Sequence, residues 1–321
     1  MPRRRRTGSP PDVLSTIELP GPWQHLRLSA HGARFHVAVS GTGPLVLLLH
    51  GFPEFWWTWR HQLPALEAAG FRAAAMDLRG YGSSDKTPRG YDPVTLAGDV
   101  AAVISALGEQ SAIVVGHGWG GIVAWAVATV HPRHVHGLVA VGAPHPLLMR
   151  SRRHLSARLG QLATLSAMQL PWIPERALIA DDAAMVERLL RRWSAPGAAF
   201  PNAEEAARYR AAMRIWPASH CAMEYQRWLV RSYLRSDGRR FVGRLTQPVR
   251  CPVLQVHGLD DSAMPADLAR RSDAHVAAPF TWEPLLGAGH FPHEERPHAF
   301  NAALLGWLSH QHSAGRVGSI S

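Results

Sequence analysis

The stretch that most constrains the fold is Val114-Val115-Gly116-His117-Gly118-Trp119-Gly120-Gly121. A short apolar run precedes it at residues 112–115, and a helical pattern follows it at residues 122–130. An apolar strand, a Gly-x-x-x-Gly turn and a helix form the context of a nucleophile elbow, a sharp turn that projects its central side chain into a pocket. The central residue here is Gly118, which has no side chain. The sequence therefore predicts an elbow whose nucleophile position is vacant.

Strand and helix patterns alternate on both sides of this turn. The run Leu45-Val46-Leu47-Leu48-Leu49 is uninterrupted and apolar, which is typical of a strand buried on both faces of a parallel sheet. Further strands are expected at residues 25–29, 33–39, 71–76, 136–141, 252–257 and 279–284. Helices are expected at residues 58–69, 95–107, 265–272 and 297–309. This alternation predicts an α/β fold with a parallel sheet and helices on both of its faces.

The pattern changes between residues 144 and 248. This segment has no apolar strand, and its helical stretches are broken by prolines. We expect a helical cap at 144–248, inserted into a core that spans 21–143 and 249–312. Residues 1–20 are predicted to be a basic disordered tail, and residues 313–321 a flexible tail.

Composition argues against several classes of partner. No apolar run approaches the roughly 18–20 residues that a membrane span needs, so no transmembrane segment is expected. The net charge is +10, but no groove-reading or base-stacking motif accompanies it, and we expect no nucleic-acid partner. The basic run from Arg3 to Arg6 would allow weak contact with anionic lipid, at about 1 kcal/mol per arginine. A solvated tail is the simpler expectation.

Cofactor and compartment signals are sparse. Cys221 and Cys251 are too few for a disulfide framework or a metal knuckle, and they suit a reducing cytoplasm. The first residues lack the apolar stretch of a secretory signal, so none is expected. The spacing of His131, His134 and His136 does not predict a metal site. No Gly-x-Gly-x-x-Gly motif follows a strand, and we expect neither a cofactor nor a metal. The oligomeric state stays open.

Candidate chemistry lies at the strand ends, because the ligand crevice of an open parallel sheet forms there. Asp261 follows one predicted strand and His290 follows the next. With Gly118 at the elbow, the chain order of nucleophile position, acid and histidine is that of the α/β-hydrolases. The acid would fix the imidazole tautomer and stabilise its cation, so that the imidazole acts as a general base. Asp260 competes for the acid position, but the Gly-x-x-Asp spacing favours Asp261.

Four ordered motifs resemble those of the epoxide hydrolase and haloalkane dehalogenase group, and most closely the epoxide hydrolases. They are His50-Gly51-Phe52-Pro53-Glu54-Phe55-Trp56-Trp57-Thr58-Trp59-Arg60, Asp77-Leu78-Arg79-Gly80-Tyr81-Gly82, the elbow itself, and Gly289-His290-Phe291-Pro292-His293-Glu294-Glu295. The resemblance implies an α/β-hydrolase fold with a mostly parallel eight-stranded sheet. It implies an oxyanion hole made by the backbone amides of Phe52 and Trp119, and cap tyrosines that grip the epoxide oxygen. It also implies an aspartate nucleophile that forms an alkyl-enzyme ester.

Two positions depart from that pattern. Gly118 stands where the family has its aspartate, and Gln226 stands where the family has a cap tyrosine before an arginine. Tyr225 is adjacent, but one residue on a helix is about 100° of rotation, so we expect it to point elsewhere. Removal of the nucleophile of a hydrolase triad costs about 10⁶ in rate. We therefore expect no epoxide hydrolysis by the covalent mechanism of the family.

Three functional hypotheses follow. In the first, water activated by His290 and Asp261 hydrolyses a small apolar epoxide or ester. In the second, the protein is catalytically inactive and binds a small apolar ligand or a partner. In the third, the same pair serves a cofactor-free lyase or oxygenase. The pocket of the first hypothesis would be lined by His50, Trp56, Trp57, Gln226 and Trp228. The intact acid and histidine favour hydrolysis.

Overall fold

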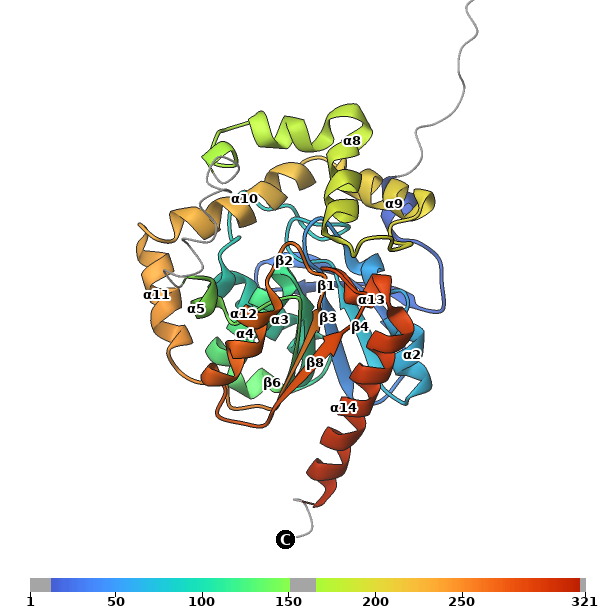
Figure 1. Ribbon diagram of the computed structural model, residues 1–321, viewed down its shortest axis with the longest axis vertical. Helices are drawn as coiled ribbons and strands as arrows, with labels where there is room; N and C mark the ends of the chain where they lie inside the picture. Colours follow the sequence, from blue (N-terminus) through green and yellow to red (C-terminus); the bar gives the residue numbers. More distant parts are fainter. Residues whose placement is uncertain (1–12, 151–165, 318–321) are drawn as a thin grey trace, which may run out of the picture.

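The computed structural model describes residues 13–150 and 166–317, and its centre is a single eight-stranded sheet (Figure 1). The strand order is β1-β2-β4-β3-β5-β6-β7-β8. The strands are β1 (Gln24–Ala30), β2 (Ala33–Ser40), β3 (Leu45–Leu49), β4 (Arg72–Met76), β5 (Ala112–His117), β6 (Val135–Val141), β7 (Val253–Gly258) and β8 (Phe280–Leu285). Only the β1–β2 and β2–β4 pairs are antiparallel. The prediction of a mostly parallel, eight-stranded sheet is confirmed.

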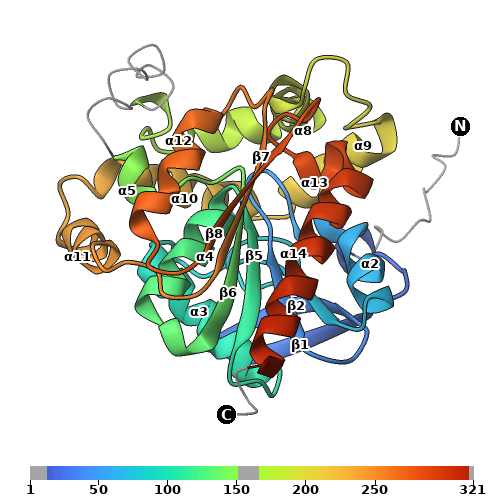
Figure 2. The same cartoon turned by 60° about the horizontal axis from the view of Figure 1, so that its bottom comes forward.

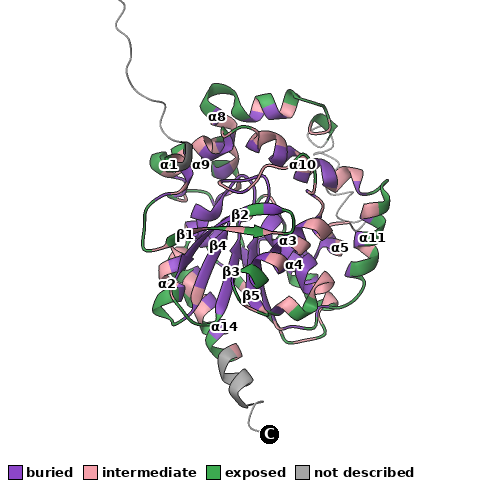
Figure 3. Cartoon of the chain, turned by 180° about the vertical axis from the view of Figure 1, so that it is seen from behind, coloured by how far each residue is buried: buried purple, intermediate pink, exposed green. Residues whose placement is uncertain are grey.

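Helices cover both faces of this sheet, as Figures 1 and 2 show. On one face α3 (Pro93–Ala106) packs beside α4 (Trp119–Val130), and on the other α2 (Gln62–Ala68) lies beside α14 (Pro297–Val317). Helix α3 starts where its neighbouring residues favour a helix start. The side chain of Asp92 accepts hydrogen bonds from the amides of Val94 and Thr95, and Pro93 is the first residue of the helix. Buried residues run along the central strands between the two helical layers (Figure 3). Strand β3 is buried along its whole length, as its apolar run predicts.

The described part of the segment between β6 and β7 contains helices and loops but no strand. It contains α5 (Pro146–Met149), α8 (Ile173–Trp193), α9 (Ala203–Met213), α10 (Ala218–Arg231) and α11 (Ser236–Leu245). Helices α8, α9 and α10 contact one another and lie above one end of the sheet (Figure 1), and we call these three the cap helices. Helix α11 packs against α4 instead. The domain bounds at residues 144 and 248 stay a prediction.

Both predicted tails are too long. Helix α1 spans Val13–Ile17, and Ile17 and Leu19 are buried in the core. At the other end α14 continues to Val317 instead of ending at residue 309. The predicted basic run from Arg3 to Arg6 lies outside the described residues. The described helices include none long and apolar enough to cross a membrane.

The helix predicted at residues 58–69 is divided in two. A 3₁₀ turn covers Trp56–Trp59, and α2 begins only at Gln62. Proline has no N–H, so Pro64 cannot donate the helical hydrogen bond to the carbonyl of Arg60 that a continuous helix would require. The remaining short helices near the C-terminal half are α12 (Ala266–Arg270), the 3₁₀ helix η4 (Arg271–His275) and α13 (Pro292–Glu295).

Candidate functional site

The elbow between β5 and α4 is formed as the sequence predicts. Gly118 has φ +52° and ψ −114°, a conformation that strains a residue with a side chain but that glycine adopts freely. Its amide donates to the carbonyl of Val141 at 3.0 Å. The strand and the helix approach so closely that a Cβ on Gly116 would lie 2.2 Å from the carbonyl oxygen of Gly120. The sharp turn therefore depends on glycine at position 116 as well as at position 118.

Asp261 and His290 lie together at the carboxyl ends of β7 and β8. The Nδ1 atom of His290 is 2.8 Å from Oδ2 of Asp261. The other carboxylate oxygen of Asp261 accepts hydrogen bonds from the amides of Ala263 and Met264, at 2.8 and 2.9 Å, which fix its orientation. The competing residue, Asp260, is exposed. Asp261 is thus the residue that meets the histidine, and we call His290 and Asp261 the dyad.

The electrostatics of the dyad favour a histidine that binds a proton. Burial alone would lower the pKa of His290, but the charge and hydrogen bond of Asp261 raise it above the ordinary value of 6.5. Burial would likewise raise the pKa of Asp261, yet the interaction with His290 holds it below its ordinary value. Since Nδ1 faces the carboxylate, Nε2 is the atom that can take a proton from a reacting group.

That Nε2 atom faces the vacant position at the elbow. A Cβ built on Gly118 would lie 3.6 Å from Nε2 of His290 and 3.7 Å from the Cα atom of Gly51. Apart from its chain neighbours, no other described atom would come within 4 Å. Within the described chain, Nε2 has no hydrogen-bond partner, although His290 is only 8% exposed. The imidazole and the elbow therefore face each other across the position that a side chain on Gly118 would occupy.

Two backbone amides lie next to this position. Trp119 is the first residue of α4, so its N–H belongs to the first turn, where helical amides have no partner within the helix. Phe52 follows Gly51 in the loop after β3. Neither amide donates a hydrogen bond to a described residue. Both remain available for the oxyanion role that the resemblance implies.

Two of the predicted pocket residues lie in the core instead. His50 is wholly buried, with Nδ1 bonded to the carbonyl of Gly51 at 2.8 Å and Nε2 accepting from the amide of Leu78 at 3.1 Å. Trp56 is also wholly buried, and its indole donates to the carbonyl of Ile17 at 2.7 Å. These two predictions are wrong because a place in a strand-end motif does not reveal which way a side chain points.

The other three pocket predictions fall on cap contacts. Trp57 packs edge-on against Tyr209 of α9, with 5.9 Å between centroids, and Trp228 of α10 packs edge-on against Phe241. Gln226 is half-buried, and its side chain has no hydrogen bond with a described residue. None of the three has a described hydrogen bond or ring contact with the dyad.

Tyr225, the neighbour of Gln226, does not take over the missing tyrosine position. Its ring packs edge-on against Trp119, with 5.2 Å between centroids. Its hydroxyl, however, donates to the carbonyl of Arg79 at 2.7 Å, and the whole side chain is buried. The hydroxyl is therefore already engaged with the core.

Sequence reasoning missed Trp193, the last residue of α8. Its carbonyl accepts the backbone N–H of His290 at 2.8 Å. Its indole lies 5.7 Å from the ring of His290 and 6.3 Å from that of Phe52, measured between centroids. Trp193 thus covers the base with an apolar ring and also holds its backbone. No motif marks this tryptophan among the others of the chain.

A buried network behind the dyad was also missed. Glu54 contacts Nδ1 of His117 at 2.6 Å and Nε2 of His293 at 3.2 Å, and Nε2 of His117 donates to the carbonyl of His290 at 2.8 Å. Burial would raise the pKa of Glu54, but the two histidines hold it well below its ordinary value. The side chain of Thr58 and the amide of Gly51 also donate to Glu54.

Among the described residues, these form one of two groups with metal-ligand chemistry. Ligand-type atoms of Glu54, His117 and His293 lie within 4.8 Å of one another, as do those of His61, Glu205 and Glu294. In the first group, Glu54 already contacts both histidines. In the second, the guanidinium of Arg60 already bridges the two carboxylates at 2.6 Å each. In both groups the carboxylates therefore already have partners within the chain.

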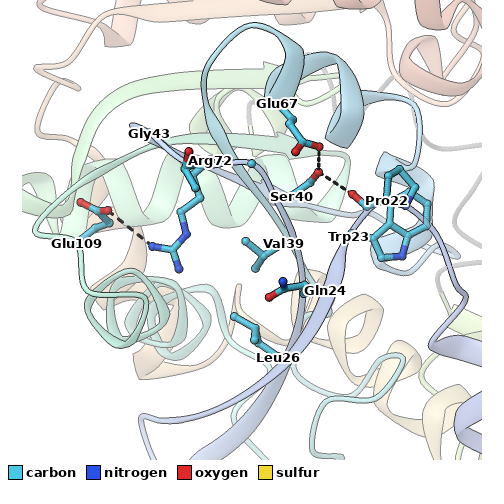
Figure 4. A pocket seen from close by; sticks show the side chains of 12 residues that line it. Pro22, Trp23, Gln24, Leu26, Val39, Ser40, Gly43, Glu67, Arg72 and Glu109 are labelled. Atoms are coloured by element: carbon cyan, nitrogen blue, oxygen red, sulfur yellow. Dashed lines mark hydrogen bonds and ion pairs between the residues drawn. The ribbon is translucent and has the colours of Figure 1, made fainter.

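A surface hollow of about 610 Å³ lies at the edge where the parallel strands begin (Figure 4). Trp23 lines it together with Glu67, Arg72 and Glu109. Its polar groups are paired: Ser40 donates to Glu67, and Arg72 lies 3.8 Å from Glu109. Arg72 is the first residue of β4, whereas the dyad follows the carboxyl ends of strands, so the hollow is separate from the dyad.

Comparison with known proteins decides the family. Residues 44–297 match the family model described as the alpha/beta hydrolase fold. The chain is 32% identical over 293 residues to the AB hydrolase superfamily protein YfhM of Bacillus subtilis, covering 88% of this chain and 97% of that protein. It is 31% identical over 291 residues to epoxide hydrolase 3 of Xenopus tropicalis, covering 88% and 77%. The chain is an epoxide hydrolase-like member of the α/β-hydrolase family.

A solved structure agrees with this assignment. An epoxide hydrolase from an endophytic Streptomyces is 30% identical to this epoxide hydrolase-like chain, with a TM-score of 0.78 over 92% of this chain and 97% of that one. The family resemblance inferred from the four motifs is therefore confirmed. In this α/β-hydrolase the elbow carries Gly118, and helix α10 carries Gln226.

Proposed function

We propose that this epoxide hydrolase-like protein is a hydrolase in which water, activated by His290 and Asp261, cleaves a small apolar ester. One observation carries the proposal: Nε2 of the buried His290, backed by Asp261 at 2.8 Å, points to a place 3.6 Å away that the missing side chain leaves open. A general base must lie within hydrogen-bond reach of the proton that it removes. A water molecule between Nε2 and the elbow meets that requirement.

The proposed reaction needs no covalent intermediate. Nε2 takes a proton from the water as the water oxygen bonds to the acyl carbon, and Asp261 stabilises the resulting imidazolium. The carbonyl oxygen becomes an oxyanion, which the amides of Phe52 and Trp119 would stabilise. When the tetrahedral species collapses, the bond to the leaving oxygen breaks and the imidazolium returns its proton to that oxygen. The products are a carboxylic acid and an alcohol.

An ester suits these residues better than an epoxide. Opening an epoxide ring requires an acid at the ring oxygen, and Gln226 has an amide where the family has a phenol. The Tyr225 hydroxyl donates to the carbonyl of Arg79. An ester needs only an oxyanion site and a base, both of which have candidates here. Epoxides stay the second substrate class, because the similar proteins named above are called epoxide hydrolases.

Turnover of p-nitrophenyl esters and aryl epoxides by the purified protein tests this proposal. We expect ester hydrolysis by the natural chain and a loss of at least about 100-fold in His290→Gln, the scale of general-base catalysis. His136→Gln is the matched control, since His136 is exposed on β6. If the natural chain hydrolyses neither class, or if both variants retain full activity, the proposal fails. An inert natural chain would leave the ligand-binding hypothesis.

A further inference from the structure

We propose that the position left open at Gly118 is a binding site for a small monocarboxylate such as formate or acetate. The carboxylate of this ligand would lie where the family has the carboxylate of its aspartate. The inference rests on the proposed function, because both require Nε2 of His290 to serve a group at the elbow. A bound carboxylate would displace the hydrolytic water from Nε2 and so inhibit ester hydrolysis.

The first support is the room at the elbow. An atom at the Cβ position of Gly118 would make ordinary van der Waals contacts with His290 and Gly51 and would touch nothing else within 4 Å outside its chain neighbours. By contrast, a Cβ on the nearby Gly116 or Gly120 would lie 2.2 or 2.3 Å from backbone atoms. Among these three glycines, Gly118 alone leaves space for an added group.

The second support is the set of hydrogen-bond donors around this room. The amide of Trp119 opens α4, a helix of 12 residues whose amino-terminal end carries partial positive charge. The amide of Phe52 has no partner among the described residues either. These amides alone would not define a binding site, because every helix starts with amides that have no partner within the helix.

A third observation makes the site specific. His290 is 8% exposed, and within the described part of the chain its Nε2 atom has no partner and points to the open position. Its Nδ1 atom is held by Asp261, so the ring cannot turn Nε2 elsewhere without losing that bond. When the ring is protonated, Nε2 carries an N–H that has no partner in the described chain, and a carboxylate oxygen can accept it.

The hydrogen-bond donors around the open position suit a carboxylate. Asp261 meets the Nδ1 side of the ring, and Glu54 lies behind it, bonded to His117, so neither carboxylate contacts Nε2. One imidazolium N–H and two amides would offer three donors to the two oxygens of a carboxylate. The rings of Trp193 and Phe52 beside His290 favour a short apolar substituent over a phosphate.

The test is an NMR titration of the His290 ring with sodium formate, at an ionic strength kept constant with sodium chloride. The His290 signals are assigned by their loss in His290→Gln. In the natural chain we expect the NMR chemical shifts of the His290 ring to change saturably with formate concentration, with half-saturation in the millimolar range. The pKa of His290 should rise as formate binds. Formamide, the neutral analogue, should produce no such shift. A response that does not saturate, or an equal response to formamide, would overturn the proposal.

Gly118→Asp provides the matched variant, because it supplies its own carboxylate and should abolish the response to formate. An unchanged response in this variant, once circular dichroism has shown that it folds, would also overturn the proposal. If it does not fold, line broadening of ¹³C-formate is compared between the natural chain and His290→Gln, and equal broadening counts against the site.

Ester hydrolysis is measured in parallel. A chain that binds formate but is inert contradicts only the hydrolase, and an active chain that ignores formate contradicts only this site.

Discussion

The Nη1 atom of Arg60 lies 2.6 Å from Oε1 of Glu294, and this ion pair is almost wholly buried. The other terminal nitrogen of the same guanidinium lies 2.6 Å from Glu205, near the start of cap helix α9. Glu294 belongs to α13, directly after the loop that carries His290. Tyr209 of α9 also donates to Glu294. Helix α9 and the loop that carries His290 are thereby joined through one buried carboxyl group.

The stability of the protein should depend on pH through this carboxyl. Burial raises the pKa of Glu294 from 4.5 to about 7, although Arg60 opposes the shift. The folded state therefore holds this proton more tightly, and the contribution is complete below pH 4.5 and is lost as the pH rises through about 7. A shift of this size corresponds to about 3 kcal/mol. Glu294→Gln should flatten the decline in unfolding free energy between about pH 5 and 8, as measured in urea.

The exposed pair of Glu204 with Arg208 gives the control for that measurement. Glu204→Gln should keep the pH dependence of the natural chain. Parallel curves for the natural chain and Glu294→Gln would contradict the role assigned to Glu294.

The pH dependence of ester hydrolysis should report His290. The neutral imidazole accepts the proton, and the pKa of His290 is raised above 6.5, so kcat/KM should increase with pH through a midpoint above that value. Asp261→Asn removes the carboxylate that raises this pKa. We expect its midpoint to move to lower pH and its plateau to drop by about 100-fold or more. Asp260→Asn, which changes the exposed neighbour, should alter neither, and an unmoved midpoint in Asp261→Asn would refute this assignment.

Restoring the missing residues should restore covalent chemistry. Gly118→Asp combined with Gln226→Tyr supplies a nucleophile at the elbow and a phenol in the cap. With His290→Gln added to block hydrolysis, mass spectrometry should detect an adduct of one aryl epoxide per chain. The natural chain should form none. The absence of an adduct in a folded triple variant would show that the elbow does not hold the aspartate in an attacking geometry.

The two elbow glycines should respond differently to alanine. At Gly118 the methyl group meets only ordinary contacts, and the positive φ costs about 1–3 kcal/mol. At Gly116 the methyl group would lie 2.2 Å from a backbone oxygen, so Gly116→Ala should cost more than that or prevent folding. Urea unfolding measures both. Gly306→Ala on α14, where a methyl group meets nothing within 4 Å, should be neutral or stabilising.

The sheet and the dyad could be predicted because their signals are local. The apolar run of β3 and the places of Asp261 and His290 after successive strands follow from short stretches of sequence. Trp193 and Trp56 could not be placed, because their surroundings depend on contacts between segments far apart in the chain. One tryptophan covers the base and the other lies in the core, and nothing in their flanking residues distinguishes the two.

The carbonyl of Trp193 accepts the amide of His290, and two residues later the amide of Ala195 donates to Glu295 at 2.7 Å. Glu295 also accepts the amides of Gly289 and Phe291, which flank the histidine. The end of α8 is thus part of the frame that positions the base. A chimera that exchanges the cap helices for those of a relative must keep the native junction from Trp193 to Ala195. A graft that rebuilds this junction would change substrate preference and base position together, and the two effects could not be tuned independently.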